Sequence, residues 1–247
     1  MLGGLELPQK GKVHLWYVPL DRPAESVASF ARVLSPDELD RANRYVFESD
    51  RRHYMVARGT LRTILSAYLA VPPDSLRFEY GPRGKPSLAA VNGTAALGFN
   101  LAHSHECALL AFADGLEVGV DLEYLRSLES VTAIAERYFT REEQAQIARV
   151  DQARSASVFL TYWTRKEAIL KLTGHGLAQP LDSVDVSWRN ERSQLQRVED
   201  TEGTAWRVTV QDLRPAPDYV GAVAVEGDVW SVQWRYAATG QSCVGSV

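Results

Sequence analysis

Cysteine is almost absent from this sequence, since Cys107 and Cys243 are the only two in the chain. Two cysteines are too few for a disulfide framework, and they do not supply the thiolate set of a structural zinc site. Cys107 also lies in the apolar run CALLAFA at 107–113, which favours a buried structural role. The cysteine content is typical of a reducing compartment, and we expect a cytoplasmic protein.

Long apolar runs and an excess of positive charge are missing as well. No run approaches the ~20 apolar residues that span a bilayer, and the amino-terminal segment lacks the uninterrupted apolar stretch of an export signal. The net charge is −4, so the overall basic character of many nucleic-acid-binding proteins is absent. We therefore expect no membrane anchor and no nucleic-acid partner. Any anionic ligand must be met by local groups of Arg and Lys.

Two short motifs carry the chemistry. In GVDLE at 119–123, apolar and acidic residues alternate, which predicts a strand with Asp121 and Glu123 on one face. In WTRKEAILK at 163–171, Glu167 and Lys171 are four residues apart among good helix formers, so they share one helical face. The sequence thus offers three carboxylates and one ammonium group for a common site.

Three carboxylates suit a hard cation such as Mg2+, which often completes its shell with water and phosphate oxygens. This combination points to phosphoryl chemistry. The alternative for either motif alone is an ordinary surface strand end or a solvated helical ion pair worth ~0.3–0.5 kcal/mol. The two motifs together favour the metal site, with Asp121, Glu123 and Glu167 as its ligands.

The chain is long enough for one large domain or two small ones, and its helix signals suggest a duplication. Capping boxes begin at Ser35 and Thr140, and each precedes a short helix and then a longer one. The expected helices cover about 36–47, 50–69, 141–149 and 154–172. The expected strands cover 76–80, 96–101, 107–113, 183–188, 205–210, 219–225 and 229–234. Two similar α/β lobes are the simplest account, and GVDLE lies near their junction.

Further candidates lie upstream of GVDLE. The loop GPRGKP at 81–86 is rich in turn formers, and its free backbone donors suit a phosphate or an adenine edge, although a solvated hairpin turn is an equal alternative. His103 and His105 share a strand face, but two histidines alone indicate zinc only weakly. For His103 we favour a hydrogen bond to phosphate, with a half-buried structural imidazole as the alternative.

Arginine is frequent along the first helix pair. Guanidinium groups bind phosphate through two parallel hydrogen bonds, so some of these residues are candidates for a nucleotide phosphate. The remainder are expected to be solvated. The arginines of this stretch are Arg41, Arg44, Arg51, Arg52, Arg58 and Arg62.

These motifs resemble the 4′-phosphopantetheinyl transferase superfamily, specifically its large surfactin-synthetase-activating (Sfp) type. The signature pair of the family is matched by 119–123 and 163–171. Its Gly-Lys-Pro element is matched by Gly84, Lys85 and Pro86, and its Phe-Asn-x-Ser-His-Ser element by FNLAHS at 99–104. A further match, GHGLAQPLDSVDV, covers 174–186. The resemblance thus extends over most of residues 35–190.

The resemblance implies an enzyme that moves the 4′-phosphopantetheine arm of coenzyme A to a serine of an apo acyl or peptidyl carrier protein, as in holo-acyl-carrier-protein synthesis. It implies Mg2+ or Mn2+ as cofactor and adenosine 3′,5′-bisphosphate as the released product. It also implies a monomer with two pseudo-symmetric α/β lobes, each a small, mainly antiparallel sheet packed with helices. We place the lobes at 1–115 and 116–247, with the active site in the cleft between them.

Site roles follow from the same resemblance. It implies that Asp121, Glu123 and Glu167 bind the metal, that Glu167 also acts as the base, and that Lys171 neutralises charge on the pyrophosphate. It also implies that His103 and Lys166 hold phosphates. The coenzyme A contacts expected at the adenosine end and its phosphates come from Gly84, Lys85, Pro86, Arg44 and Arg58.

One departure from the family pattern is Ala102, which stands where a serine is usual. A missing hydrogen bond to a charged group costs ~1.5–3 kcal/mol, so we expect Ala102→Ser to tighten coenzyme A binding. The segment 125–139 is the expected contact for the carrier. The alternatives to a transferase are a Mg2+-dependent nucleotide hydrolase and a non-catalytic module that binds a carrier protein or an adenine nucleotide.

Overall fold

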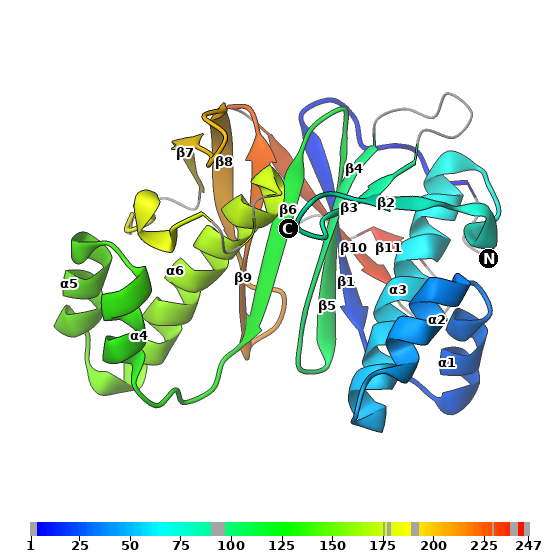
Figure 1. Cartoon of the computed structure of the whole chain (residues 1–247), viewed down its shortest axis with the longest axis horizontal. Helices are drawn as coiled ribbons and strands as arrows, with labels where there is room; N and C mark the ends of the chain where they lie inside the picture. Colours follow the sequence, from blue (N-terminus) through cyan, green and yellow to red (C-terminus); the bar gives the residue numbers. More distant parts are fainter. Residues whose placement is uncertain are drawn as a thin grey trace.

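The structure is a computed structural model that describes residues 4–89, 97–174, 176, 179–188, 193–228, 230–237 and 242–244. Two α/β halves lie side by side, with their sheets facing each other in the middle and their helices on the outside (Figure 1). None of the helices in these ranges is both long and apolar enough to cross a membrane.

The first half packs three helices against a sheet. Its helices are α1 (Ala24–Ala31), α2 (Pro36–Asn43) and α3 (Glu48–Leu69), followed by the short helix η1 (Pro73–Ser75). A two-stranded hairpin, β2 (Phe78–Tyr80) and β3 (Pro86–Leu88), comes next. The sheet has the order β11-β10-β1-β5-β4, formed by β1 (Lys12–Pro19), β4 (Leu97–Ser104), β5 (Cys107–Asp114), β10 (Ser231–Ala237) and β11 (Ser242–Val244).

The second half repeats this plan with a four-stranded antiparallel sheet of order β6-β9-β8-β7. Its strands are β6 (Val118–Tyr124), β7 (Ser193–Glu199), β8 (Ala205–Leu213) and β9 (Tyr219–Glu226). Its helices are α4 (Val131–Tyr138), α5 (Arg141–Arg149) and α6 (Gln152–Thr173), followed by the short helix η3 (Leu181–Ser183).

Apolar side chains form three layers of core. One lies between the first sheet and helices α1–α3, a second between the other sheet and α4–α6, and a third between the two sheets. Val118, Val120 and Leu122 of β6 belong to this central layer. The alternate residues of β6 therefore face α6, and this orientation directs Asp121 and Glu123 away from the core between the sheets.

The last strands cross the boundary that the sequence suggested. Strand β10 pairs in parallel with β1, and β11 pairs with β10, so residues 231–237 and 242–244 belong to the first sheet and not to the second half. The expectation that all of 116–247 forms one lobe is therefore wrong for this segment. Strand β1 was not among the expected strands. Its pairing with β10 covers an edge of β1 that would otherwise be open.

The expected duplication is supported by a buried ion pair that occurs in both halves. Both capping boxes are present, at Ser35 and at Thr140, and helices α3 and α6 are each 22 residues long. The box carboxylate Glu38 pairs with Arg62 of α3, as Glu143 pairs with Lys166 of α6. Because each pair ties a capping-box helix to the long helix that follows it, the two halves share one internal design.

One expected strand, 183–188, is a short helical turn and coil. Its carbonyl groups accept hydrogen bonds from side chains of α6 instead of a neighbouring strand: Val184 O from Lys166, and Val186 O from Arg165. Three residues of the 174–186 motif, namely 175, 177 and 178, lie outside the described residues, as does residue 229 of the expected strand 229–234.

Candidate active site

Strand β6 is pressed against helix α6 at Gly119. A Cβ atom at this position would lie 2.0 Å from Ala168 O and 2.5 Å from Leu172 N, closer than real side-chain contacts allow. Only glycine permits this approach of strand and helix. The approach brings Asp121 of β6 to Lys171 of α6, whose Nζ donates to Asp121 Oδ1 at 2.6 Å.

Asp121 is the most constrained acid of the site, with only 7% of its surface exposed. Burial raises its pKa, while the charge of Lys171 and its hydrogen bond act in the opposite direction. Its second oxygen, Oδ2, is buried without a hydrogen-bond partner among the described residues. A buried carboxylate oxygen without a donor is costly unless a cation or donor arrives with the ligand.

Glu123 and Glu167 complete the group of three acids. Burial raises the pKa of both carboxyl groups, and the charge of Asp121 raises each further. Glu123 also raises the pKa of Glu167, while Lys171 lowers the pKa of both groups. Ser104 donates to Glu123 Oε2 at 3.2 Å. The two sequence motifs, far apart in the chain, therefore come together.

These carboxylates do not form a closed metal cage. Within the described ranges, no three acidic, histidine or cysteine side chains gather as a ready-made metal site. The residues nevertheless fit Mg2+, because a cation would be attracted by the unpartnered Oδ2 of Asp121 and by Glu123 and Glu167, whose pKa values are raised by burial and by the charge of Asp121. Mg2+ commonly needs only one or two carboxylates when substrate phosphates supply the other oxygens.

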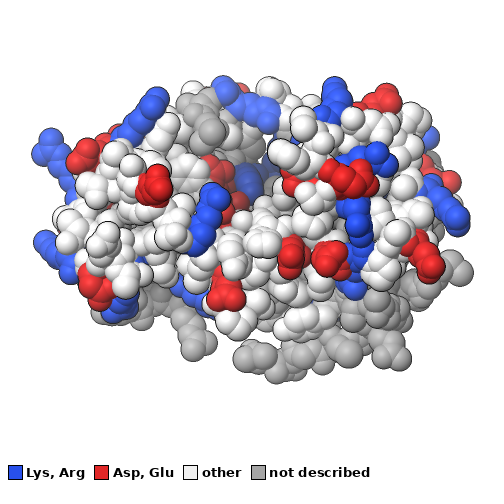
Figure 2. Space-filling model, turned by 90° about the horizontal axis from the view of Figure 1, so that it is seen from below, with Lys and Arg blue, Asp and Glu red and all other residues white. Residues whose placement is uncertain are grey.

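His103 lies near the same group. Its partial removal from water lowers its pKa, and the positive charges of Lys171 and His53 lower it further. Asp50 and Arg41 also act on His103, so the start of α3 and the end of α2 lie within electrostatic range of the site. Seen from below, the molecule has a hollow between its halves in which acidic and basic side chains lie together (Figure 2).

Lys166 has a different position from the one expected. It is fully buried, with its Nζ 3.0 Å from Glu143 Oε1 and 2.6 Å from the carbonyl oxygens of Leu181 and Val184. A lysine has three donors, and all three are engaged. The structure therefore gives Lys166 no phosphate contact. The matching pair of Arg62 and Glu38 in the first half indicates a structural role.

Of the two favoured arginines, Arg58 needs correction. Arg58 donates to the Glu38 carboxylate and to Tyr80 Oη, and its guanidinium stacks over Phe78, so this side chain is largely committed to the core. Arg44 is exposed at the end of α2, and its phosphate contact stays a prediction. Arg41, three residues earlier, is among the charges that lower the pKa of His103.

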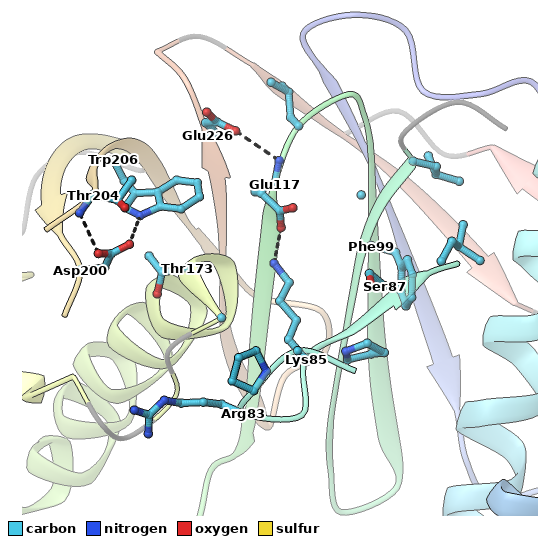
Figure 3. A pocket seen from close by; sticks show the side chains of 18 of the residues that line it. Arg83, Lys85, Ser87, Phe99, Glu117, Thr173, Asp200, Thr204, Trp206 and Glu226 are labelled. Atoms are coloured by element: carbon cyan, nitrogen blue, oxygen red, sulfur yellow. Dashed lines mark hydrogen bonds and ion pairs between the residues drawn. The ribbon is translucent and has the colours of Figure 1, made fainter. Parts of the chain in front are cut away.

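Lys85 and Pro86 of the Gly-Lys-Pro loop line a cavity of about 910 Å3 (Figure 3). Lys85 does not extend freely into it: its Nζ donates to the Glu117 carboxylate and, at 2.7 Å, to Leu172 O. The lining residues include none of the three acids. Glu117 and Thr173 line it from the start of β6 and the end of α6, whereas the acids lie further along β6 and earlier in α6.

Ala102 is buried in the core between the sheets, while its neighbour His103 is exposed. A serine hydroxyl at position 102 would therefore enter an apolar layer instead of meeting a phosphate. This burial removes the reason for expecting Ala102→Ser to tighten ligand binding.

Comparison with known proteins indicates the family of this chain. Residues 117–224 match the 4′-phosphopantetheinyl transferase superfamily model, and residues 22–114 match a model of the 4′-phosphopantetheinyl transferase N-terminal region.

Similar curated proteins carry the same name. The 4′-phosphopantetheinyl transferase HetI of Nostoc is 39% identical over 91% of this chain and 92% of its own length. The corresponding figures are 30%, 83% and 85% for psf-1 of Bacillus pumilus, and 26%, 70% and 75% for Sfp of Bacillus subtilis. The chain therefore belongs to the 4′-phosphopantetheinyl transferase superfamily and is of the Sfp type.

Proposed function

We propose that this protein transfers the 4′-phosphopantetheine arm of coenzyme A to a serine hydroxyl of an apo carrier protein in a Mg2+-dependent reaction. The observation that carries the proposal is the meeting of three acids of raised pKa with Lys171, where one buried oxygen of Asp121 lacks a partner. Such a site is suited to receive positive charge together with a phosphate group.

Each side chain has a distinct task in this proposal. Asp121 and Glu123, with Glu167, would hold the cation, which when bound supplies charge neutralisation at the pyrophosphate. Glu167 takes the proton from the serine hydroxyl, a task suited to a carboxylate whose pKa is raised by burial and by the charge of Asp121. Lys171, held beside Asp121, offsets the negative charge that develops on the leaving group.

The reaction balances without further reactants. The serine oxygen forms a bond to the phosphorus that bears the pantetheine arm. The bond from this phosphorus to the bridging oxygen breaks, and adenosine 3′,5′-bisphosphate leaves with the electron pair. The serine proton goes to Glu167. His103, which lies near Lys171, is the proposed hydrogen-bond partner of the phosphates.

The remaining expectations stay proposals. We infer that the reaction takes place between the two halves, that the chain acts as a cytoplasmic monomer, and that segment 125–139 contacts the carrier. This segment contains the turn after β6 and helix α4, with Arg126 exposed two residues after the strand that bears Asp121 and Glu123.

Intact mass spectrometry tests the proposal. An apo carrier protein incubated with this protein, coenzyme A and Mg2+ should gain one phosphopantetheine mass, and EDTA should prevent the gain. Glu167→Gln should abolish it, whereas the matched control Glu79→Gln, an exposed carboxylate on the β2–β3 hairpin, should retain it. Consumption of coenzyme A without a mass gain on several carriers would identify a hydrolase. Binding of coenzyme A without turnover would identify a non-catalytic module.

A further inference from the structure

Lys85 connects the two halves of the molecule next to the site. It lies at the tip of the β2–β3 hairpin of the first half, and its side chain extends to Glu117, just before β6 (Figure 3). The same ammonium group donates to Leu172 O in the last turn of α6 at 2.7 Å. One side chain thus contacts both elements that bear the acids.

The contact with α6 has a simple physical basis. Leu172 O belongs to the last turn of the helix, where carbonyl groups have no partner within the helix and the helix end is partly negative. A lysine supplied by another segment satisfies this carbonyl. The side-chain stem of Lys85 packs beside Gly174, whose φ is +76° and where an added Cβ would lie 3.6 Å from Lys85 Cδ.

The loop that carries Lys85 is closed by its own hydrogen bonds. Gly81 N donates to Lys85 O, and Gly84 N donates to Gly81 O, both at 2.9 Å. Gly84 has a φ of +82°, which permits this tight return of the chain. The loop therefore presents the lysine from a well-defined base. The side chain of Lys85 is 18% exposed and that of Glu117 is 48% exposed, so the lysine is the partner that is better shielded from water.

We propose that Lys85 is a positioning residue, which with Glu117 locks the hairpin to β6 and α6 and so sets the geometry of the site. This inference rests on the proposed function and assigns Lys85 a role different from the phosphate contact expected from sequence. Two of its three donors are already engaged, and the end of α6 that it holds lies one residue beyond Lys171.

Kinetics distinguish the two roles through Glu117, which a phosphate contact does not require. If the lock positions α6, both Lys85→Met and Glu117→Gln lower kcat by about 3- to 10-fold, and the double variant is no worse than the more impaired single variant. Lys85→Arg should restore part of the rate. If Lys85 instead binds phosphate, Lys85→Met raises the KM for coenzyme A at unchanged kcat, and Glu117→Gln, which frees the lysine, leaves KM equal or lower. That second pattern would overturn the proposal.

Hydrogen exchange gives a readout that needs neither carrier nor coenzyme A. The amides of Gly174, bonded to Leu170 O at 3.0 Å, and of Gly81 should exchange faster in both variants than in the wild type and in the control Glu79→Gln. Unchanged exchange at both positions would contradict the lock. If the wild type fails to modify any carrier, the proposed function fails, whereas the exchange result still decides whether the lock exists.

Discussion

Replacing Lys166 with methionine should destabilise the fold without weakening coenzyme A binding. Methionine keeps most of the apolar stem and removes the ammonium group that lies 3.0 Å from Glu143 Oε1. Glu143 is 0% exposed, so its carboxylate would remain in the core without a cation. Two carbonyl groups, of Leu181 and Val184, would also lose their donor.

The expected cost is ~3–5 kcal/mol, the usual penalty for breaking a buried ion pair on one side. Burial already raises the pKa of Glu143, and Lys166 counteracts that rise. In the variant the carboxyl group would therefore take up a proton, which limits the loss. A loss of this size is a large fraction of the ~5–15 kcal/mol free energy of unfolding that is typical of a folded protein.

Urea unfolding followed by tryptophan fluorescence measures this loss. Arg149→Met is the matched control, because its 3.9 Å contact with Glu142 is exposed and should be worth at most ~1 kcal/mol. Adding Glu143→Gln to Lys166→Met should recover at least ~1 kcal/mol by removing the unpaired charge. If Lys166→Met unfolds at the wild-type urea concentration while the KM for coenzyme A rises severalfold, Lys166 binds phosphate after all and the structural role is refuted.

Three further predictions concern the site. In EDTA at neutral pH, Glu167→Gln should melt no lower than wild type in a calorimetric scan while transfer falls by at least ~100-fold. Because the pKa of Glu167 is higher in the folded than in the unfolded protein, its charged form opposes folding above the unfolded pKa of ~4.3. The metal-free wild type should therefore gain stability as the pH falls from neutral toward that value. A lower melting temperature for Glu167→Gln than for wild type would contradict this direction. Gly119→Ala should cost about 1–3 kcal/mol and reduce transfer by separating β6 from α6, whereas Gly4→Ala, with no heavy atom within 4 Å, should change neither urea unfolding nor rate. Ala102→Ser should cost ~1–3 kcal/mol and leave the Kd for coenzyme A unchanged in calorimetric titration, and tighter binding would show that the hydroxyl reaches the phosphate.

Local patterns in the sequence were sufficient for several elements. The capping boxes at Ser35 and Thr140 mark real helix starts, and the expected long helices agree closely with α3 and α6. The alternation in 119–123 correctly predicts a strand. These features depend on neighbours within one or two turns of chain, so residue spacing alone determines them.

The sequence by itself thus determined the family, most of the helices and the residue types of the site. Only the tertiary structure decided which cation meets which carboxylate: Lys166 meets Glu143, Arg58 meets Glu38, and Lys85 meets Glu117. It also decided that β10 joins β1 across nearly the whole chain. A sequence motif shows which charged residues are present, but not which of them are buried on folding. A buried charge needs a partner because it has lost its water. A lysine that is paired in the core is therefore no longer available to a ligand.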